Sequence, residues 1–163
     1  MKEAFSFHSS SEEVTLRFGR ALGAVLAPGI TVLLSGELGA GKTVLVRGVG
    51  EALGITKVRS PSFTLINEYM TPDFLLVHAD LYRLEPEEID GLGLEDYADD
   101  REGCVVFVEW AERWQTPPRD VLKIVIEAKG GTDRVLEALS TGEKSDRVLL
   151  NLRGALGKED TKK

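Results

Sequence analysis

The sequence predicts an α/β fold in which helices cover both faces of a mixed, largely parallel sheet. Two short apolar runs, ITVLLSG (30–36) and CVVFVEW (104–110), are rich in β-branched residues and have the length of strands buried on both faces. Segments with apolar residues at helical spacing lie between such runs along the chain. This interleaving is typical of a sheet covered by helices on its two sides.

The N-terminal segment predicts a short edge strand, AFSF (4–7), followed by an amphipathic helix over 9–26. Ser10 with Glu13 fits a capping box at the start of this helix, and Ser11 could cap it equally well. A second helix is expected from about Lys42 to Leu53, because it follows a buried strand and ends at Gly54. Further strands are predicted at FTLINEY (63–69), FLLVHADLY (74–82), VLKIVIEAK (121–129) and RVLEALS (134–140), with a last helix at 145–156.

Length and composition indicate one domain. The chain has 163 residues, enough for a single core, so we expect one domain over 1–156 and a polar, disordered tail over 157–163. No apolar run approaches the roughly 20 residues of a membrane helix, and the first residues lack the apolar segment of a signal peptide, so a cytoplasmic location is expected. A single cysteine, Cys104, excludes a disulfide framework within the chain.

The charge balance is acidic. The formal net charge is −7, with 27 Asp and Glu against 20 Lys and Arg, which argues against direct, sequence-independent binding of nucleic acid. Acidic residues concentrate in EPEEIDGLGLEDYADD (85–100). Such a stretch is usually a solvated face, and the alternative is a docking surface for a basic partner.

The segment GELGAGKT (36–43) matches the phosphate-loop pattern G-x-x-x-x-G-K-[ST]. Its glycines let the backbone turn tightly and approach phosphates, while the start of the following helix adds positive potential. Lys42 is expected to reach the β- and γ-phosphates, and the Thr43 hydroxyl to coordinate Mg²⁺. Because a strand precedes the loop and a helix follows it, the elements together predict a three-layer P-loop NTPase fold.

Two acidic residues end buried strands. Asp80 closes FLLVHAD and Glu109 closes VVFVE, and both strand ends are expected at the carboxyl edge of the sheet, where ligands bind in open α/β folds. Glu109 fits the Walker-B arrangement best; the alternative for either residue is a surface carboxylate. His78 precedes Asp80 by two residues and is either a satisfied core histidine or a catalytic one. No N-K-x-D motif for guanine is present, which favours ATP over GTP.

The chain resembles the TsaE (YjeE) family of bacterial ATPases for tRNA threonylcarbamoyladenosine biosynthesis. The resemblance rests on the blocks GELGAGKT, SPSFTLINEY, HADLYRL and VEWAE, in family order between Gly36 and Glu112. It implies an ATPase that uses ATP and Mg²⁺ and is required for the t6A37 modification of tRNA. It also implies that hydrolysis resets or assembles a complex of the TsaB and TsaD proteins. These partners, and not this chain, would carry the tRNA.

The resemblance also implies roles for individual residues. Thr43 and Glu109 match metal-binding positions, and Asp80 matches an acid that orients water or holds the metal through water. Thr64 is the residue of a switch-like segment, 60–69, expected to sense the γ-phosphate. The implied nucleotide contacts are Ser11, Glu37, Leu38, Gly39, Ala40, Gly41, Lys42, Thr43, Thr64, Trp110 and Arg134.

Two other functions compete with a reset ATPase. A small-molecule P-loop kinase would need an acceptor pocket and usually an arginine-bearing lid, and the sequence has no lid-like insertion. A binding module with a purely structural nucleotide would not need the Lys42–Thr43 pair together with two strand-end acids. Both alternatives stay open at this stage and are separated by the products formed from ATP.

Overall fold

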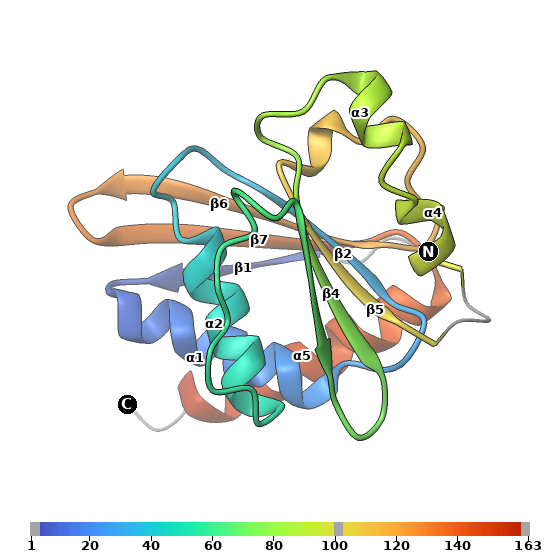
Figure 1. The fold of residues 1–163 in the computed structure, drawn as a ribbon. Coiled ribbons are helices and arrows are strands. Elements are labelled where there is room, and N and C mark those ends of the chain that lie inside the picture. The colour runs from blue at the N-terminus through green and yellow to red at the C-terminus, as the bar shows by residue number, and fades with distance from the viewer. Residues whose placement is uncertain (1–3, 100–102, 161–163) are drawn as a thin grey trace.

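The computed structural model describes residues 4–99 and 103–160. In this part of the chain a seven-stranded sheet is surrounded by helices (Figure 1). The strands are β1 (Ala4–Ser9), β2 (Thr31–Ser35), β3 (Ile66–Met70), β4 (Leu75–Asp80), β5 (Val105–Glu109), β6 (Leu122–Gly130) and β7 (Asp133–Ser140). The helices are α1 (Glu12–Val25), α2 (Lys42–Ala52), α3 (Pro86–Asp90), α4 (Leu94–Tyr97), the 3₁₀ helix η2 (Ala111–Arg113) and α5 (Glu143–Asp160).

The strand order is β1-β7-β6-β2-β5-β4-β3. The central pairs β6–β2, β2–β5 and β5–β4 are parallel, whereas β1–β7, β7–β6 and β4–β3 are antiparallel. The predicted α/β class with a mixed sheet and helices on both faces is therefore confirmed, and the parallel pairs lie at the centre of the sheet. Because β4 and β5 are parallel and in register, Asp80 pairs with Glu109 at the carboxyl edge of the sheet.

Two hydrophobic clusters lie on opposite faces of the sheet. One joins the sheet to α1, α2 and α5, and the other joins it to α3, α4 and η2. Strand β2 contributes Val32 and Leu34 to the first cluster and Leu33 to the second, so it is buried on both faces as its apolar sequence predicts. The result is a three-layer arrangement with the sheet in the middle (Figure 1).

Helices α1 and α2 pack closely on the same face. A Cβ built on Gly19 of α1 would lie 2.2 Å from the carbonyl oxygen of Leu45 in α2, and one on Gly48 would lie 2.3 Å from the carbonyl oxygen of Leu16. Glycine at both positions therefore allows the backbones to approach. This contact places the start of α1 beside the start of α2.

Several boundaries differ from the sequence prediction. Ser11 caps α1, since its Oγ accepts from Val14 N at 3.2 Å, so the second of the two proposed caps is present. Strand β3 begins at Ile66 and not at Phe63, because Leu65 adopts φ 71° and interrupts the extended backbone. Helix α5 continues to Asp160, into the tail 157–163 expected to be disordered; residues 161–163 lie outside the described part.

None of the helices in residues 4–99 and 103–160 combines the length and the apolar character that a membrane span needs.

Candidate functional site

The glycine loop lies between the end of β2 and the start of α2. Gly39 and Gly41 have φ angles of 80° and 111°, which side-chain-bearing residues rarely adopt. A Cβ on Gly36 would lie 2.6 Å from the carbonyl oxygen of Ile126. No described side chain caps the first turn of α2, so its backbone N–H groups are left for another acceptor. A helix start with free N–H groups behind a glycine bend is a binding site for anionic groups.

Lys42 is folded over this loop. Its ammonium donates to the carbonyl oxygens of Gly36 and of Glu37, the second at 3.0 Å, and lies 4.4 Å from the centre of the Trp110 ring. The residue is only 5 % exposed. Burial lowers the pKa of the Lys42 ammonium, while the charge of Glu109 acts in the opposite direction. An ammonium has three N–H donors, so one remains for an incoming acceptor.

Two carboxylates and a hydroxyl converge beside Lys42. Both oxygens of Glu109 lie 3.4 Å from Thr43 Oγ1, although the glutamate is 66 residues further along the chain. Asp80 neighbours Glu109 in the sheet and accepts the backbone N–H of Tyr82 at 3.0 Å. Burial raises the pKa of the Asp80 carboxyl; the Tyr82 N–H opposes this rise, and the nearby charge of Glu109 adds to it.

His78 is tied to the same carboxylate. Its Nε2 lies 2.5 Å from Glu109 Oε2, and the imidazole is fully buried. The other ring nitrogen, Nδ1, has no hydrogen-bond partner among the described residues. One ring nitrogen of His78 is therefore hydrogen-bonded and the other is not. In the sequence, the only sign of the contact with Glu109 was that His78 and Asp80 lie on the same face of one strand.

A pocket opens over these groups, and it collects most of the residues predicted from the sequence. Ser60 and Ser62 of the segment after α2 also line it, with their hydroxyl oxygens 2.7 Å apart. The lining residues are Leu38, Gly39, Gly41, Lys42, Thr43, Val44, Ser60, Ser62, Asp80, Glu109 and Trp110.

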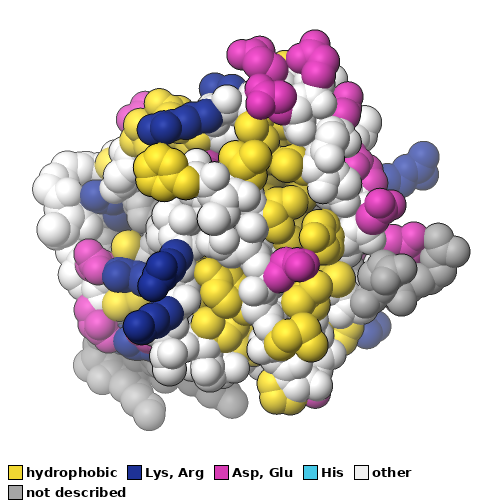
Figure 2. All heavy atoms as spheres, in the orientation of Figure 1, with side chains coloured by type: hydrophobic (Ala, Val, Ile, Leu, Met, Phe, Trp, Pro, Cys, Tyr) yellow, Lys and Arg dark blue, Asp and Glu magenta, His cyan; other side chains and the backbone are white. Residues whose placement is uncertain are grey.

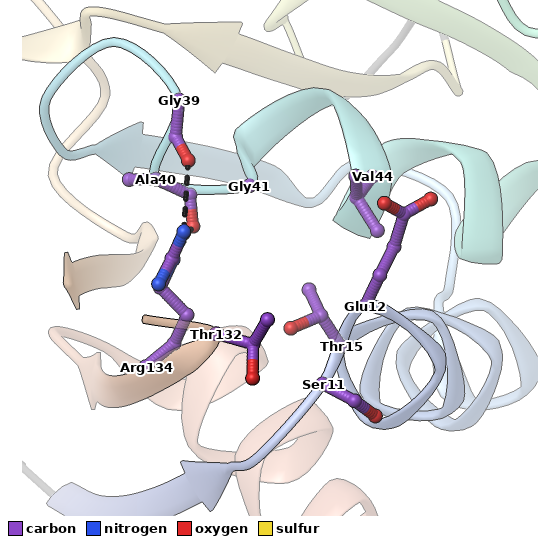
Figure 3. A pocket seen from close by; sticks show the side chains of 9 residues that line it. All are labelled: Ser11, Glu12, Thr15, Gly39, Ala40, Gly41, Val44, Thr132 and Arg134. Atoms are coloured by element: carbon purple, nitrogen blue, oxygen red, sulfur yellow. Dashed lines mark hydrogen bonds between the residues drawn. The ribbon is translucent and has the colours of Figure 1, made fainter. Parts of the chain in front are cut away.

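A second pocket lies on the other side of the loop, between the start of α1 and the β6–β7 hairpin (Figure 3). Ser11 and Arg134, both predicted to flank the nucleotide, line it together with Ala40. Arg134 points at the loop and donates to its carbonyl oxygens (Figure 3). Thr15 and Thr132 also line the pocket, and they were missed because isolated threonines carry no motif.

Thr64 does not occupy the expected position. It lines a separate hollow with Lys57, Asn67 and Tyr97, and its hydroxyl donates to Asn67 Oδ1 at 2.6 Å. Thr64 ends a turn over residues 62–64, closed by a hydrogen bond from Leu65 N to Pro61 O at 2.8 Å, and it does not line the glycine-loop pocket that Ser60 and Ser62 border. Glu37 contributes its backbone carbonyl to Lys42 and is not among the residues that line either pocket.

The donor set fits Mg²⁺ shared with a nucleotide. No group of three or more His, Cys, Asp or Glu side chains that could hold a metal occurs within the described residues. Mg²⁺ ordinarily keeps several waters and binds through one or two carboxylates plus substrate phosphates, so such a cage is not needed. Thr43 and Glu109 supply the hydroxyl and the carboxylate on one edge of the pocket.

The fold and the loop define the class of protein: a P-loop NTPase fold with the glycine bend between β2 and α2. The chain belongs to the TsaE family, because it matches the family described as "Threonylcarbamoyl adenosine biosynthesis protein TsaE" over residues 9–137. Proteins of this family take part in tRNA threonylcarbamoyladenosine biosynthesis.

Individual relatives support the same family assignment. The chain is 45 % identical over 120 residues to a "tRNA threonylcarbamoyladenosine biosynthesis protein TsaE" from Nostoc sp., covering 72 % of this chain and 74 % of the relative. It is 39 % identical over 138 residues to the protein of the same description from Bacillus subtilis, covering 83 % and 85 %. The crystal structure of Bacillus subtilis YdiB superposes with a TM-score of 0.79 at 31 % identity, over 93 % of this chain and 95 % of that chain.

Proposed function

We propose that this protein binds and hydrolyses ATP with Mg²⁺, and that hydrolysis resets or assembles the TsaB–TsaD complex during tRNA threonylcarbamoyladenosine synthesis. The observation that carries the proposal is the convergence of Lys42, Thr43, Asp80 and Glu109 on one pocket at the glycine loop. These residues come from α2, β4 and β5, and a purely structural turn would not require them together.

The chain's own groups account for nucleotide binding. Backbone N–H groups at the start of α2 and the Lys42 ammonium offer positive charge to the phosphates. Arg134 and Ser11 line the pocket on the far side of the loop, which suits the remainder of the nucleotide. Thr43 and Glu109 are the residues that would hold Mg²⁺, which would supply charge neutralisation at the phosphate oxygens.

Asp80 is the group best suited to orient an attacking water. It borders the same pocket, lies beside Glu109 in the sheet and has one oxygen fixed by the Tyr82 N–H. A second carboxylate close to the proposed metal ligand leaves one acid for the metal and one for the water. Ser60 and Ser62, and not Thr64, are the hydroxyls of the switch-like segment that border the pocket.

The acidic surface supports the part of the proposal in which this protein meets tRNA only through its partners. The acids of α3 and of Glu85 before it are exposed, and Figure 2 shows acidic side chains gathered at this end of the molecule. With a formal net charge of −7, the chain is poorly suited to hold tRNA by charge alone. In the proposal TsaB and TsaD bind the tRNA, and this protein acts on them.

The test is a pull-down of tagged protein with purified TsaB and TsaD, with ATP, with a non-hydrolysable analogue and without nucleotide. Phosphate release and phosphorylated products are measured in the same samples. We expect nucleotide-dependent association and free phosphate, with Lys42→Ala as the matched variant that loses both. Association that ignores nucleotide, or a phosphorylated small molecule as the product, would contradict the proposal, and the second result would indicate a kinase.

A further inference from the structure

We infer that His78 is a positioning residue for Glu109: its imidazole holds the carboxylate in the orientation that faces Thr43. The inference rests on the proposed binding of Mg²⁺–ATP and adds a buried residue, which does not line the pocket, to the groups on which the site depends.

The sheet register creates the contact. His78 pairs with Phe107 across the parallel strands β4 and β5, so Glu109 lies two residues further along β5 on the same face. The Nε2 atom reaches Glu109 Oε2 at 2.5 Å. A carboxylate only accepts hydrogen bonds when ionised, so Nε2 is the donor in either protonation state of the ring.

Packing alone does not explain a histidine at this position. Its side chain is fully buried, and Nδ1 has no partner among the described residues. A buried polar atom without a hydrogen bond costs stability, and an apolar residue would avoid that cost. The bond to Glu109 is the interaction that an apolar replacement could not make.

The bond constrains a flexible ligand. A glutamate side chain has several rotatable bonds, and in the observed orientation both oxygens of Glu109 lie 3.4 Å from Thr43 Oγ1. His78 fixes Oε2 from within the protein, on a nearly buried carboxylate that is 4 % exposed. Hydrogen-bond partners behind metal ligands typically change metal affinity by about 10- to 100-fold.

His78 does not act on the substrate directly. It is absent from the residues that line the pocket, whereas Asp80 and Glu109 are present there. His78 therefore acts by positioning Glu109. Loss of the His78 imidazole should weaken the binding of Mg²⁺ more than the binding of the nucleotide itself.

The experiment compares His78→Gln with His78→Asn in the full chain. A glutamine amide can reach the position of Nε2, whereas an asparagine amide ends near Nδ1 and is too short to reach Glu109. Affinity for a non-hydrolysable ATP analogue is measured by calorimetry over a series of Mg²⁺ concentrations, which gives the apparent Mg²⁺ affinity, and again in EDTA. Leu76→Val, fully buried on the same face of β4 two residues earlier, is the control for packing changes.

We expect His78→Asn to lower the apparent Mg²⁺ affinity by about 10- to 100-fold, with little change in EDTA. His78→Gln should recover most of this loss, and Leu76→Val should respond to Mg²⁺ like the unaltered protein. His78→Met, which places an apolar side chain beside Glu109, is a second variant without the donor and should behave like His78→Asn.

Other results would overturn the inference. An unchanged Mg²⁺ response in both His78→Asn and His78→Met would do so, as would equal losses with Mg²⁺ and with EDTA, because these indicate general damage. If the unaltered protein bound no analogue under either condition, the proposed function itself would fail. That result is distinct from a defect confined to the variants.

Discussion

Arg134 Nε donates to the main-chain carbonyl oxygen of Ala40 at 3.1 Å, across 94 residues of sequence. The same guanidinium donates from Nη2 to Gly39 O at 3.3 Å and from Nη1 to Gly131 O and Asp133 O, both at 2.9 Å. One side chain thus fastens the glycine loop to the β6–β7 hairpin. In a trans peptide the C=O and N–H groups point in opposite directions. The N–H of Gly41, which follows the Ala40 carbonyl, therefore faces away from Arg134.

Arg134→Lys should weaken binding of an ATP analogue by about 10-fold, or about 1.4 kcal/mol. Lysine offers a point charge and cannot reproduce the planar set of donors that spans loop and hairpin. Calorimetric titration measures the dissociation constant. Arg20→Lys is the matched control, since Arg20 makes exposed ion pairs with Glu13 and Glu51 away from the loop. Equal affinities of Arg134→Lys and the unaltered protein would remove Arg134 from the site.

Lys42→Ala should lower ATP hydrolysis by at least about 100-fold in the presence of TsaB and TsaD, because it removes the buried cation nearest the loop. Thr43→Ala should have a similar effect through the loss of the hydroxyl beside Glu109. Steady-state phosphate release is the measurement. Lys129→Ala, which alters an exposed lysine paired with Glu127, should leave the rate unchanged. Normal turnover in either site variant would contradict the assignment.

Asp120→Asn should destabilise the fold near neutral pH by about 1 kcal/mol, as for the loss of a helix cap. Burial alone would raise the pKa of Asp120, but hydrogen bonds from the Ser145 side chain and from the N–H groups of Lys144 and Ser145 lower it. A carboxyl with a lowered pKa stabilises the folded state above its unfolded pKa. This contribution disappears as the pH falls through the folded pKa.

Chemical denaturation of Asp120→Asn at neutral and acidic pH tests the direction of this pH dependence of stability. The difference in unfolding free energy from the unaltered protein should be largest near neutrality and should shrink below the ordinary aspartate range. Asp73→Asn, at an exposed turn position, is the control and should show little difference at either pH. A difference that grows with acid would reverse the interpretation.

Gly19→Ala should destabilise the protein by about 1–3 kcal/mol, because the new Cβ would meet the Leu45 carbonyl oxygen at 2.2 Å. Gly154→Ala makes the same chemical change in α5, where the new Cβ has no neighbour within 4 Å among the described residues. There the gain in helix propensity should stabilise by about 0.5–1 kcal/mol. Urea midpoints of the two variants should therefore move in opposite directions; a shared direction would argue against the close packing of α1 on α2.

Much of the fold was predictable because its signals are local. The glycine loop, the buried run of β2 and the start of α2 at Lys42 all follow from residues adjacent in the chain. The strand-end positions of Asp80 and Glu109 followed from the same patterns, and their meeting required only that β4 and β5 be parallel. The start of β3 was missed because a single left-handed residue, Leu65, does not alter the alternating pattern.

The sequence by itself determined the phosphate loop and the class of fold, since bond geometry and short-range hydrophobic spacing decide both. Only the tertiary structure decided that His78 holds Glu109, that Arg134 holds the loop, and that Ser60 and Ser62 face the pocket while Thr64 does not. These relationships join residues far apart in the chain. They depend on strand register and on the path of a turn, which packing of the whole sheet selects and no short segment encodes.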